Sequence, residues 1–476
     1  MTASVDTLVA GGMVVNETGT VAADIAIEDG RVVAIGEPGT LPAALETVDA
    51  GGRYVLPGAI DVHVHFREPG MEEKETWESG SRAAAVGGVT TVFEMPNTIP
   101  PTDSPESLAH KRSLAEAKSI VDFGLYGLLG EHNLDRLEAM AAAGAIGFKL
   151  FLGNTTGDLP CPSDGAVLEG LEILAALGKR TTIHAENSPI LFWRQQKMQR
   201  AGRIDPLAHL SARADVVALE ALNRACVLAD WTGARIHIAH ESCANSLPYI
   251  RFHKSRGVDV TVETLPQYLY LDAEMMLRPG GEVLRMNPPI RQKANQEPLW
   301  QALLDGTVDM IATDHAPHLP VEKYGNRIWD VACGFPGVES QMPLMLTAVN
   351  AGRLSLEHYV RLSSANPARA FGLYGRKGVL RPGADADLVV VDVGRRDRLG
   401  ADRLHSRGKT SPYEGMEVVG LPVLTMVRGK VVARDGRPVA EPGWGRQVVQ
   451  RMPPPAPRNV ETTTRAILQP DHKPWR

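Results

Sequence analysis

The sequence has 476 residues, of which 43% are apolar and 22% charged, and it carries a dispersed net charge of −6; this balance is typical of a soluble globular protein and gives no sign of a nucleic-acid or membrane partner. No apolar run approaches the roughly 20 residues of a spanning helix, and the first residues lack the basic and apolar segments of a signal peptide. The four cysteines are far apart and form no CxxC pair, which fits a reducing compartment, so we expect a cytoplasmic protein.

Short β-type segments occupy both ends of the chain. Residues 24–36, DIAIEDGRVVAIG, have the pattern of a hairpin with Asp29-Gly30 as its two-residue turn. Similar segments return at residues 386–393 and 423–439, where Arg428-Gly429 and Asp435-Gly436 are the expected turns. Two β-rich ends around a different middle predict one small composite β-sandwich built from both termini.

The middle of the chain alternates short apolar strands with helical stretches. The expected strands are residues 59–66, 90–97, 122–129, 145–152, 180–186, 234–242, 258–269 and 308–315. This alternation predicts an α/β fold with a parallel sheet, and eight units favour a (β/α)8 TIM barrel. An open doubly wound sheet is the competing fold, but it would need a Gly-rich turn after its first strand.

These segments divide the chain into four predicted parts. They are 1–57, the first part of the sandwich; 58–374, the barrel; 375–440, the second part of the sandwich; and 441–476, a C-terminal tail. The tail is rich in Pro and Arg, so we expect it to wrap over a surface or a neighbouring subunit.

Polar side chains that can bind metals fall at the ends of the expected barrel strands. They are His63 and His65 on the first strand, Lys149 on the fourth, His184 on the fifth, His240 on the sixth and Asp314 on the eighth. The carboxyl ends of all barrel strands meet on one face, so these residues should share one pocket. Four imidazoles and a carboxylate exceed the three protein ligands of one catalytic zinc. The pattern therefore favours two divalent ions about 3.5–4 Å apart with a shared hydroxide.

Each of these residues also has a structural interpretation when taken alone. A histidine at a strand end can simply be hydrogen-bonded, Asp314 can cap a helix, and Lys149 can extend to water. The joint pattern is what favours a metal site. His237, three residues before His240, should face the other side of its strand, and we interpret it as structural.

Together these motifs resemble the amidohydrolase superfamily, and within it the cyclic amidohydrolases. Residues 61–70, DVHVHFREPG, and residues 312–323, ATDHAPHLPVEK, are similar to the two signatures of dihydroorotases. FEMPNTIP (93–100), RMNPPIR (285–291) and KLFLGNTTG (149–157) also resemble dihydroorotase segments. The resemblance implies a barrel with a composite sandwich, two zinc ions, and a homodimer or homotetramer. It also implies that CO₂ carboxylates Lys149, which then bridges the ions.

The expected reaction is hydrolysis of a cyclic amide. The hydroxide would attack the ring carbonyl, and Asp314 would act as general base and then as general acid towards the leaving nitrogen. Arg67, spaced i, i+2 from His65, should also point into the pocket, where its guanidinium suits a carboxylate; the alternative is a surface ion pair with Glu68 or Glu72. By resemblance, the substrate contacts are Arg67, Asn97 and His318 at a carboxylate and Asn287, Cys333 and Gly334 at the ring.

The main hypothesis is a dihydroorotase, which interconverts dihydroorotate and N-carbamoyl-L-aspartate in pyrimidine biosynthesis. The alternative is an allantoinase or a hydantoinase (dihydropyrimidinase), which Gln267 and the run HESCAN (240–245) favour. A third hypothesis is a catalytically inactive homologue that serves as a scaffold. Such a protein should have lost metal ligands, whereas this chain keeps all six positions.

Overall fold

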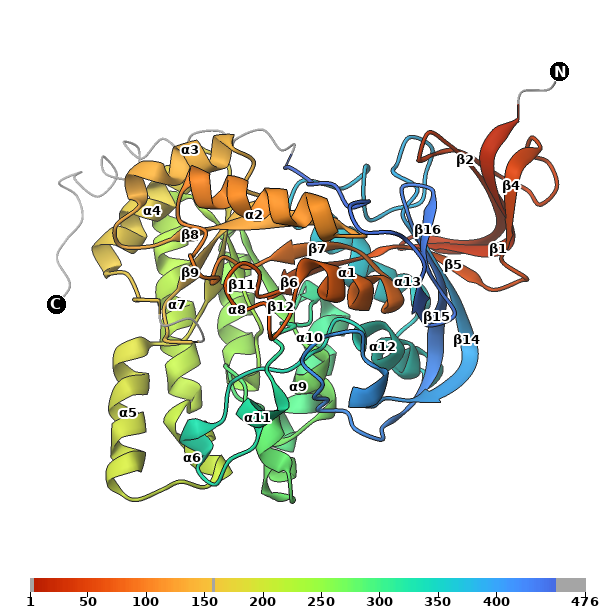
Figure 1. Cartoon of the computed structure of the whole chain (residues 1–476). Coiled ribbons are helices and arrows are strands. Elements are labelled where there is room, and N and C mark those ends of the chain that lie inside the picture. Colours follow the sequence, from red (N-terminus) through yellow and green to blue (C-terminus); the bar gives the residue numbers. More distant parts are fainter. Residues whose placement is uncertain (1–3, 156–158, 451–476) are drawn as a thin grey trace.

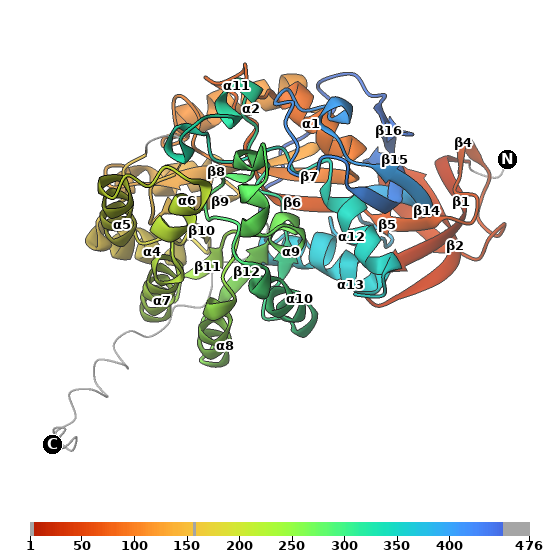
Figure 2. The same ribbon diagram turned by 90° about the horizontal axis from the view of Figure 1, so that it is seen from below.

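One of the two sheets forms a parallel barrel. The computed structural model describes residues 4–155 and 159–450. The eight strands are paired in the order β13-β12-β11-β10-β9-β8-β7-β6, and a parallel bridge between Val64 and His315 links the two ends of this series (Figures 1 and 2). Their bounds are β6 (Ala59–Val64), β7 (Val89–Glu94), β8 (Asp122–Leu129), β9 (Gly147–Phe151), β10 (Arg180–His184), β11 (Arg235–Ile238), β12 (Val260–Thr264) and β13 (Met310–Ile311). The predicted barrel, with its eight strands, is confirmed.

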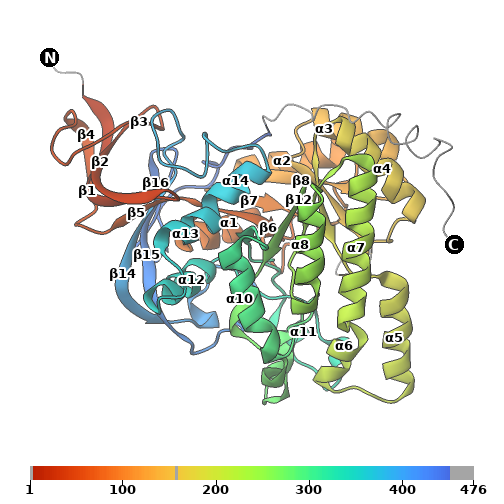
Figure 3. The ribbon, with the colours of Figure 1, turned by 180° about the vertical axis from the view of Figure 1, so that it is seen from behind.

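Helices surround the barrel strands, and Figure 3 shows α7, α8 and α10 on its outer side. The helices are α1 (Trp77–Val86), α2 (Pro105–Lys118), α3 (Leu137–Ala142), α4 (Asp164–Ala176), α5 (Ser188–Arg200), α6 (Pro206–Ala212), α7 (Asp215–Thr232), α8 (Leu247–Ser255), α9 (Pro266–Tyr270), α10 (Gln296–Asp305), α11 (Pro320–Lys323), α12 (Gln341–Asn350), α13 (Leu356–Val360) and α14 (Asn366–Ala370). Local sequence explains several of their ends. The Thr76 hydroxyl accepts the Ser79 N–H at the start of α1, and Gly233 ends α7 at φ +71°. No helix in the described parts of the chain is long and apolar enough to cross a membrane.

The second sheet joins both ends of the chain, as Figures 1 and 3 show. It has nine strands, with β4 paired to β1 beside the order β17-β16-β15-β14-β5-β1-β2-β3. The strands are β1 (Val5–Asn16), β2 (Gly19–Glu28), β3 (Arg31–Gly36), β4 (Ala44–Asp49), β5 (Tyr54–Pro57), β14 (Leu388–Arg398), β15 (Glu417–Val427), β16 (Lys430–Arg434) and β17 (Arg437–Pro438). The composite sandwich domain is therefore confirmed, while the exact divisions at 57/58, 374/375 and 440/441 stay predictions.

The predicted two-residue turns connect strands of this sheet. At Asp29-Gly30 the backbone has φ of +50° and +72°, and Glu28 pairs with Arg31 across the turn. Arg428-Gly429 and Asp435-Gly436 have the same left-handed pair of φ values. Positive φ at both turn positions matches the right-handed twist of the strands that flank such hairpins.

A buried ionic cluster lies where the barrel meets the sandwich. The Lys377 ammonium is 2.5 Å from Asp122 on β8, 3.1 Å from Asp385 and 2.5 Å from Asp387. Arg428, from the turn after β15, also pairs with Asp122. These charges tie a barrel strand to the returning segment of the chain.

The described part of the tail runs beside β8. The Phe123 N–H donates to the Arg446 carbonyl over 3.0 Å, and the Val448 N–H donates to the Phe123 carbonyl over 2.8 Å. This segment therefore covers the barrel wall of its own chain. The remainder of the expected tail, 451–476, lies outside the described residues.

Candidate active site

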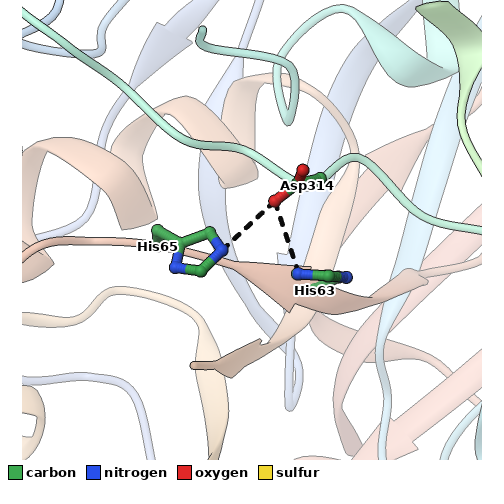
Figure 4. Close-up of side chains that lie close together, drawn as sticks. All are labelled: His63, His65 and Asp314. Carbon is green, nitrogen blue, oxygen red and sulfur yellow. Dashed lines mark ion pairs between the residues drawn. The ribbon is translucent and has the colours of Figure 1, made fainter. Parts of the chain in front are cut away.

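Two histidines of the first barrel strand meet the aspartate that follows the last one. His63 Nε2 is 3.3 Å and His65 Nε2 is 3.1 Å from the same carboxylate oxygen, Oδ1 of Asp314. Figure 4 shows the two rings directed at this oxygen. All three side chains are buried, and their ligand atoms lie within 4.8 Å of one another. This geometry can hold one metal ion.

The other two predicted histidine ligands form a second group beside the first. His184 Nδ1 and His240 Nε2 are 3.0 Å apart, and the ring centroids of His63 and His240 are 5.2 Å apart. His240 and Asp314 both have left-handed backbones, with φ of +38° and +47°. Such conformations are uncommon outside glycine and are typical of functional sites. Here they occur just past the ends of β11 and β13, at residues that contribute to this cluster.

Lys149, the sixth predicted ligand, is buried on β9. Its Nζ has no hydrogen-bond partner among the described residues and lies 5.3 Å from the centre of the Phe151 ring. The interpretation that this lysine extends to water is therefore wrong. Burial lowers the pKa of Lys149 to about 8. A buried amine without a partner, close to imidazoles and a carboxylate, fits a group that becomes an anionic metal ligand.

Burial also keeps the imidazoles neutral. It lowers the pKa of His63 to about 4 and the pKa values of His65 and His240 well below the usual range. Neutral imidazole offers a lone pair to a metal, which imidazolium cannot do. Burial raises the pKa of Asp314, which makes this carboxylate a better proton acceptor. The donor set therefore fits two divalent ions.

Arg67 lies beside the metal ligands and is 1% exposed. The alternative of a surface ion pair with Glu68 or Glu72 is wrong, because Arg67 is buried; Glu68 is also buried and pairs with Lys118. Arg67 Nη1 has no hydrogen-bond partner among the described residues, and Nη2 is 3.3 Å from His318 Nε2. His318 Nε2 is also 3.1 Å from the Cys333 carbonyl.

Each nitrogen of the His318 ring lies between a donor and an acceptor. Nε2 is near the Cys333 carbonyl, which only accepts, and near Arg67 Nη2, which only donates. Nδ1 is 3.5 Å from the Lys74 ammonium and 3.6 Å from Glu322 Oε2. Arg67 Nη1 is the buried donor without a partner among the described residues, and an acceptor atom of a substrate can satisfy it.

The remaining predicted contacts do not all line one cavity. Asn287, His318 and Cys333 line a cavity of about 400 Å³, and the Oδ1 atom of Asn287 is buried without a partner among the described residues. Asn97 hydrogen-bonds His65. Gly334 has φ of +121° and donates its N–H to the Arg285 carbonyl. It is not among the residues that line this cavity.

Gln267 is structural rather than directed at a substrate. Its Nε2 donates to the Thr313 carbonyl over 2.9 Å, and its Oε1 accepts from the Tyr413 hydroxyl over 3.2 Å. It therefore supports the segment that carries Asp314. Gln267 favours the hydantoinase alternative as a sequence pattern, but its side-chain amide is used in contacts within the protein.

Sequence reasoning missed two buried carboxylates behind the histidines. Glu263 Oε1 is 2.5 Å from His63 Nδ1, and Glu186 Oε2 is 2.9 Å from His184 Nε2. The signal was available, because each is an acidic residue at or just after the end of an apolar strand. The expectation that His237 faces away from this cluster is wrong: its Nε2 is 3.0 Å from Glu263 Oε2. β11 ends at Ile238, so strand alternation does not extend to His240.

A (β/α)8 barrel with clustered histidines, a lysine and an aspartate at its strand ends is the architecture of a metal-dependent hydrolase. Residues 54–432 match the model of the amidohydrolase family, and the chain belongs to this family. It is 37% identical to an L-hydantoinase of Paenarthrobacter aurescens, over 94% of this chain and 98% of that one. It is 39% identical to an allantoinase of Rubrobacter xylanophilus (92% and 96% covered) and 39% identical to a dihydroorotase of Methanosarcina acetivorans (89% and 91% covered).

The fold of a solved hydantoinase structure is also similar to the fold of this chain. The L-hydantoinase (dihydropyrimidinase) from Arthrobacter aurescens superposes with a TM-score of 0.91 at 36% identity, covering 94% of this chain and all of that one. The protein is therefore a metal-dependent hydrolase of the cyclic amidohydrolase group. The dihydroorotase hypothesis, our main one from the sequence, has weaker support than its alternative, because the similarity to the L-hydantoinase and the allantoinase covers more of both chains than the similarity to the dihydroorotase.

Proposed function

We propose that the protein opens the ring of a cyclic ureide of the hydantoin, dihydropyrimidine or allantoin type. The observation that carries this proposal is the similarity to the L-hydantoinase, which extends over nearly the full length of both chains. The proposed substrate is a small molecule, and we expect a cytoplasmic homodimer or homotetramer, which light scattering can test.

The proposed metal centre has two halves. His63, His65 and Asp314 would hold one divalent ion, and His184 and His240 would hold the second, with carboxylated Lys149 as the ligand common to both; zinc is the expected metal. When bound, the ions would supply a hydroxide nucleophile and would polarise the ring carbonyl. The buried, partner-free Lys149 amine supports this assignment. Elemental analysis should find about two ions per chain, and their absence from active protein would contradict it. The same elemental analysis tests the inactive-scaffold hypothesis, because a scaffold that has lost metal ligands should not bind two ions.

Asp314 is the proposed catalytic acid and base. Its Oδ1 lies within 3.3 Å of two ligand imidazoles, and burial raises its pKa. It would accept the proton from the attacking group and deliver it to the ring nitrogen as the C–N bond breaks. Asn97, Asn287, Cys333 and Gly334 remain proposed substrate contacts.

Dihydroorotase is the second candidate, and a specific observation favours it. Arg67 Nη1 is buried without a hydrogen-bond partner among the described residues, and a buried arginine suits the carboxylate that dihydroorotate carries. An uncharged ring offers a carbonyl oxygen at most.

A substrate panel separates the two candidates. We would measure kcat/KM for hydantoin, dihydrouracil, allantoin and dihydroorotate, and for the reverse reaction of their ring-opened products. Preference for an uncharged ring supports the hydantoinase or allantoinase proposal. Preference for dihydroorotate, lost in Arg67→Met, would replace it with dihydroorotase.

A further inference from the structure

Several polar side chains lie inside the barrel behind the proposed metal ligands, although barrel interiors are usually filled with apolar residues. Glu263, at the carboxyl end of β12, is completely buried. One of its oxygens, Oε1, is 2.5 Å from His63 Nδ1 and accepts a hydrogen bond from the backbone N–H of His240 over 3.0 Å. The other, Oε2, faces His237 Nε2 at 3.0 Å. One carboxylate thus contacts residues from both halves of the proposed metal centre.

The proton positions in this group follow from donor and acceptor chemistry. Glu263 Oε1 already accepts the backbone N–H of His240, and a carboxylate that faces donors with both oxygens acts as an acceptor. His63 then carries its proton on Nδ1, and His237 carries one on Nε2. The lone pair of His63 is then on Nε2, the atom that faces Asp314.

The other ring nitrogen of His237 also has a partner. His237 Nδ1 is 2.9 Å from the Thr261 hydroxyl. When Nε2 alone carries the proton, Nδ1 is an acceptor for the Thr261 O–H. The order of contacts is Thr261, His237, Glu263, His63, and each fixes the orientation of the next.

We propose that Glu263, oriented by His237, is a positioning residue that fixes the His63 tautomer and anchors His240, and so sets the affinity of the centre for metal. This inference rests on the proposed metal centre. A carboxylate behind a ligand imidazole fixes the ring and raises its basicity, and the loss of such a partner typically weakens metal binding about 10- to 100-fold. Sequence reasoning had treated His237 as merely structural.

The test measures metal binding rather than turnover. Wild type, Glu263→Gln, His237→Leu and His237→Gln would be stripped of metal and titrated against a chromophoric chelator, which yields a dissociation constant for each zinc ion. We expect Glu263→Gln to weaken one ion about 10- to 100-fold and to change the visible spectrum of the cobalt-substituted protein. His237→Leu should weaken it less, and His237→Gln, which keeps an N–H donor, should recover part of the loss.

Glu94→Gln is the matched control. Glu94 also ends a barrel strand and is 1% exposed, but it accepts the Phe66 N–H and lies near Lys111, and within the described residues it has no hydrogen bond or ion pair with a ligand imidazole. This variant should lose stability and keep both metal dissociation constants. Unchanged dissociation constants in Glu263→Gln would overturn the inference alone, whereas wild-type protein without metal affinity would overturn the proposed metal centre and the inference with it.

A measurement on the wild type covers the case in which Glu263→Gln fails to fold. Long-range proton–nitrogen spectra of metal-free protein labelled with ¹⁵N-histidine report the tautomer of each ring, and His63→Asn assigns the signal. We expect His63 as the Nδ1–H tautomer. The Nε2–H tautomer would refute the proposed role of Glu263.

Discussion

The proposed carboxylation of Lys149 predicts how the enzyme should be activated as a function of pH. Carbamate formation joins the neutral amine to CO₂ and releases a proton, so its rate follows the neutral fraction of the lysine. Burial lowers the pKa of Lys149 to about 8 from an ordinary value of 10.5. At pH 7 roughly 10% of such a lysine is neutral, against about 0.03% of an exposed one. The buried site therefore gains a factor of about 300 in reactive amine.

The pH dependence of the activation rate distinguishes a buried lysine from an ordinary one. Between pH 7 and pH 9 the neutral fraction of Lys149 should rise about tenfold and then level off, because the pKa lies inside this range. An ordinary lysine would gain about 100-fold over the same range and would keep rising to about pH 10. The pH dependence of activation thus reports the burial of the amine.

The assay would follow reactivation of metal-free protein by zinc at a constant concentration of dissolved CO₂. The rate of recovery and the ¹³C carbamate signal from labelled CO₂ should change together. Lys323 is the internal control, because its Nζ is buried but already donates to the Arg285 and Ala332 carbonyls, so no carbamate should form there. Recovery that is independent of CO₂, or a carbamate signal that survives in Lys149→Ala, would refute the reasoning.

Three further changes test other parts of the protein. Arg67→Met should keep the metals and lower kcat/KM for an anionic ring by ten- to a hundredfold, since a hydrogen bond to a charged group contributes about 1.5–3 kcal/mol; equal losses on charged and neutral rings would make Arg67 structural. Asp314→Asn should lose turnover by at least about 100-fold because an amide cannot move the proton, and near-normal kcat would assign that step elsewhere. Lys377→Met should lower the free energy of unfolding in urea by about 3–5 kcal/mol, because it removes the buried cation that three carboxylates share and leaves Asp387 with no other ion pair in the described part of the chain. Arg398→Met, which breaks an exposed pair with Glu417, should cost at most about 1 kcal/mol, and equal losses would contradict the role of the buried cluster.

Local sequence patterns predicted the fold because they act over short distances. Alternation of apolar strands with helices indicated all eight barrel strands, and three Xaa-Gly turns indicated three hairpins. The pattern was least accurate at strand ends. The eighth strand was expected to reach residue 315 but stops at Ile311, because Asp314 turns into a left-handed conformation that directs its carboxylate at the histidines.

The contacts that orient the ligands were beyond local patterns because they join distant segments. Glu263 is 200 residues from His63 in sequence, and His318 is 251 residues from Arg67. Closure of the barrel brings each pair together, and no spacing rule encodes that event. The sequence could therefore indicate candidate metal ligands but not which carboxylate contacts each imidazole.

The same division explains why the substrate is harder to infer than the chemistry. The proposed metal ligands sit on or directly after barrel strands, which packing holds in place, whereas Arg67, His318 and Asn287 lie on connecting segments. Connecting segments tolerate substitution and carry recognition, so relatives can share a hydrolytic centre and differ in the ring they open. In this chain the segment after β6 presents a buried cation, Arg67, next to a proposed centre shared with relatives named for uncharged rings. Burying an N–H donor without an acceptor is costly, so the partner-free Nη1 of Arg67 argues that the substrate, charged or neutral, places an oxygen against it.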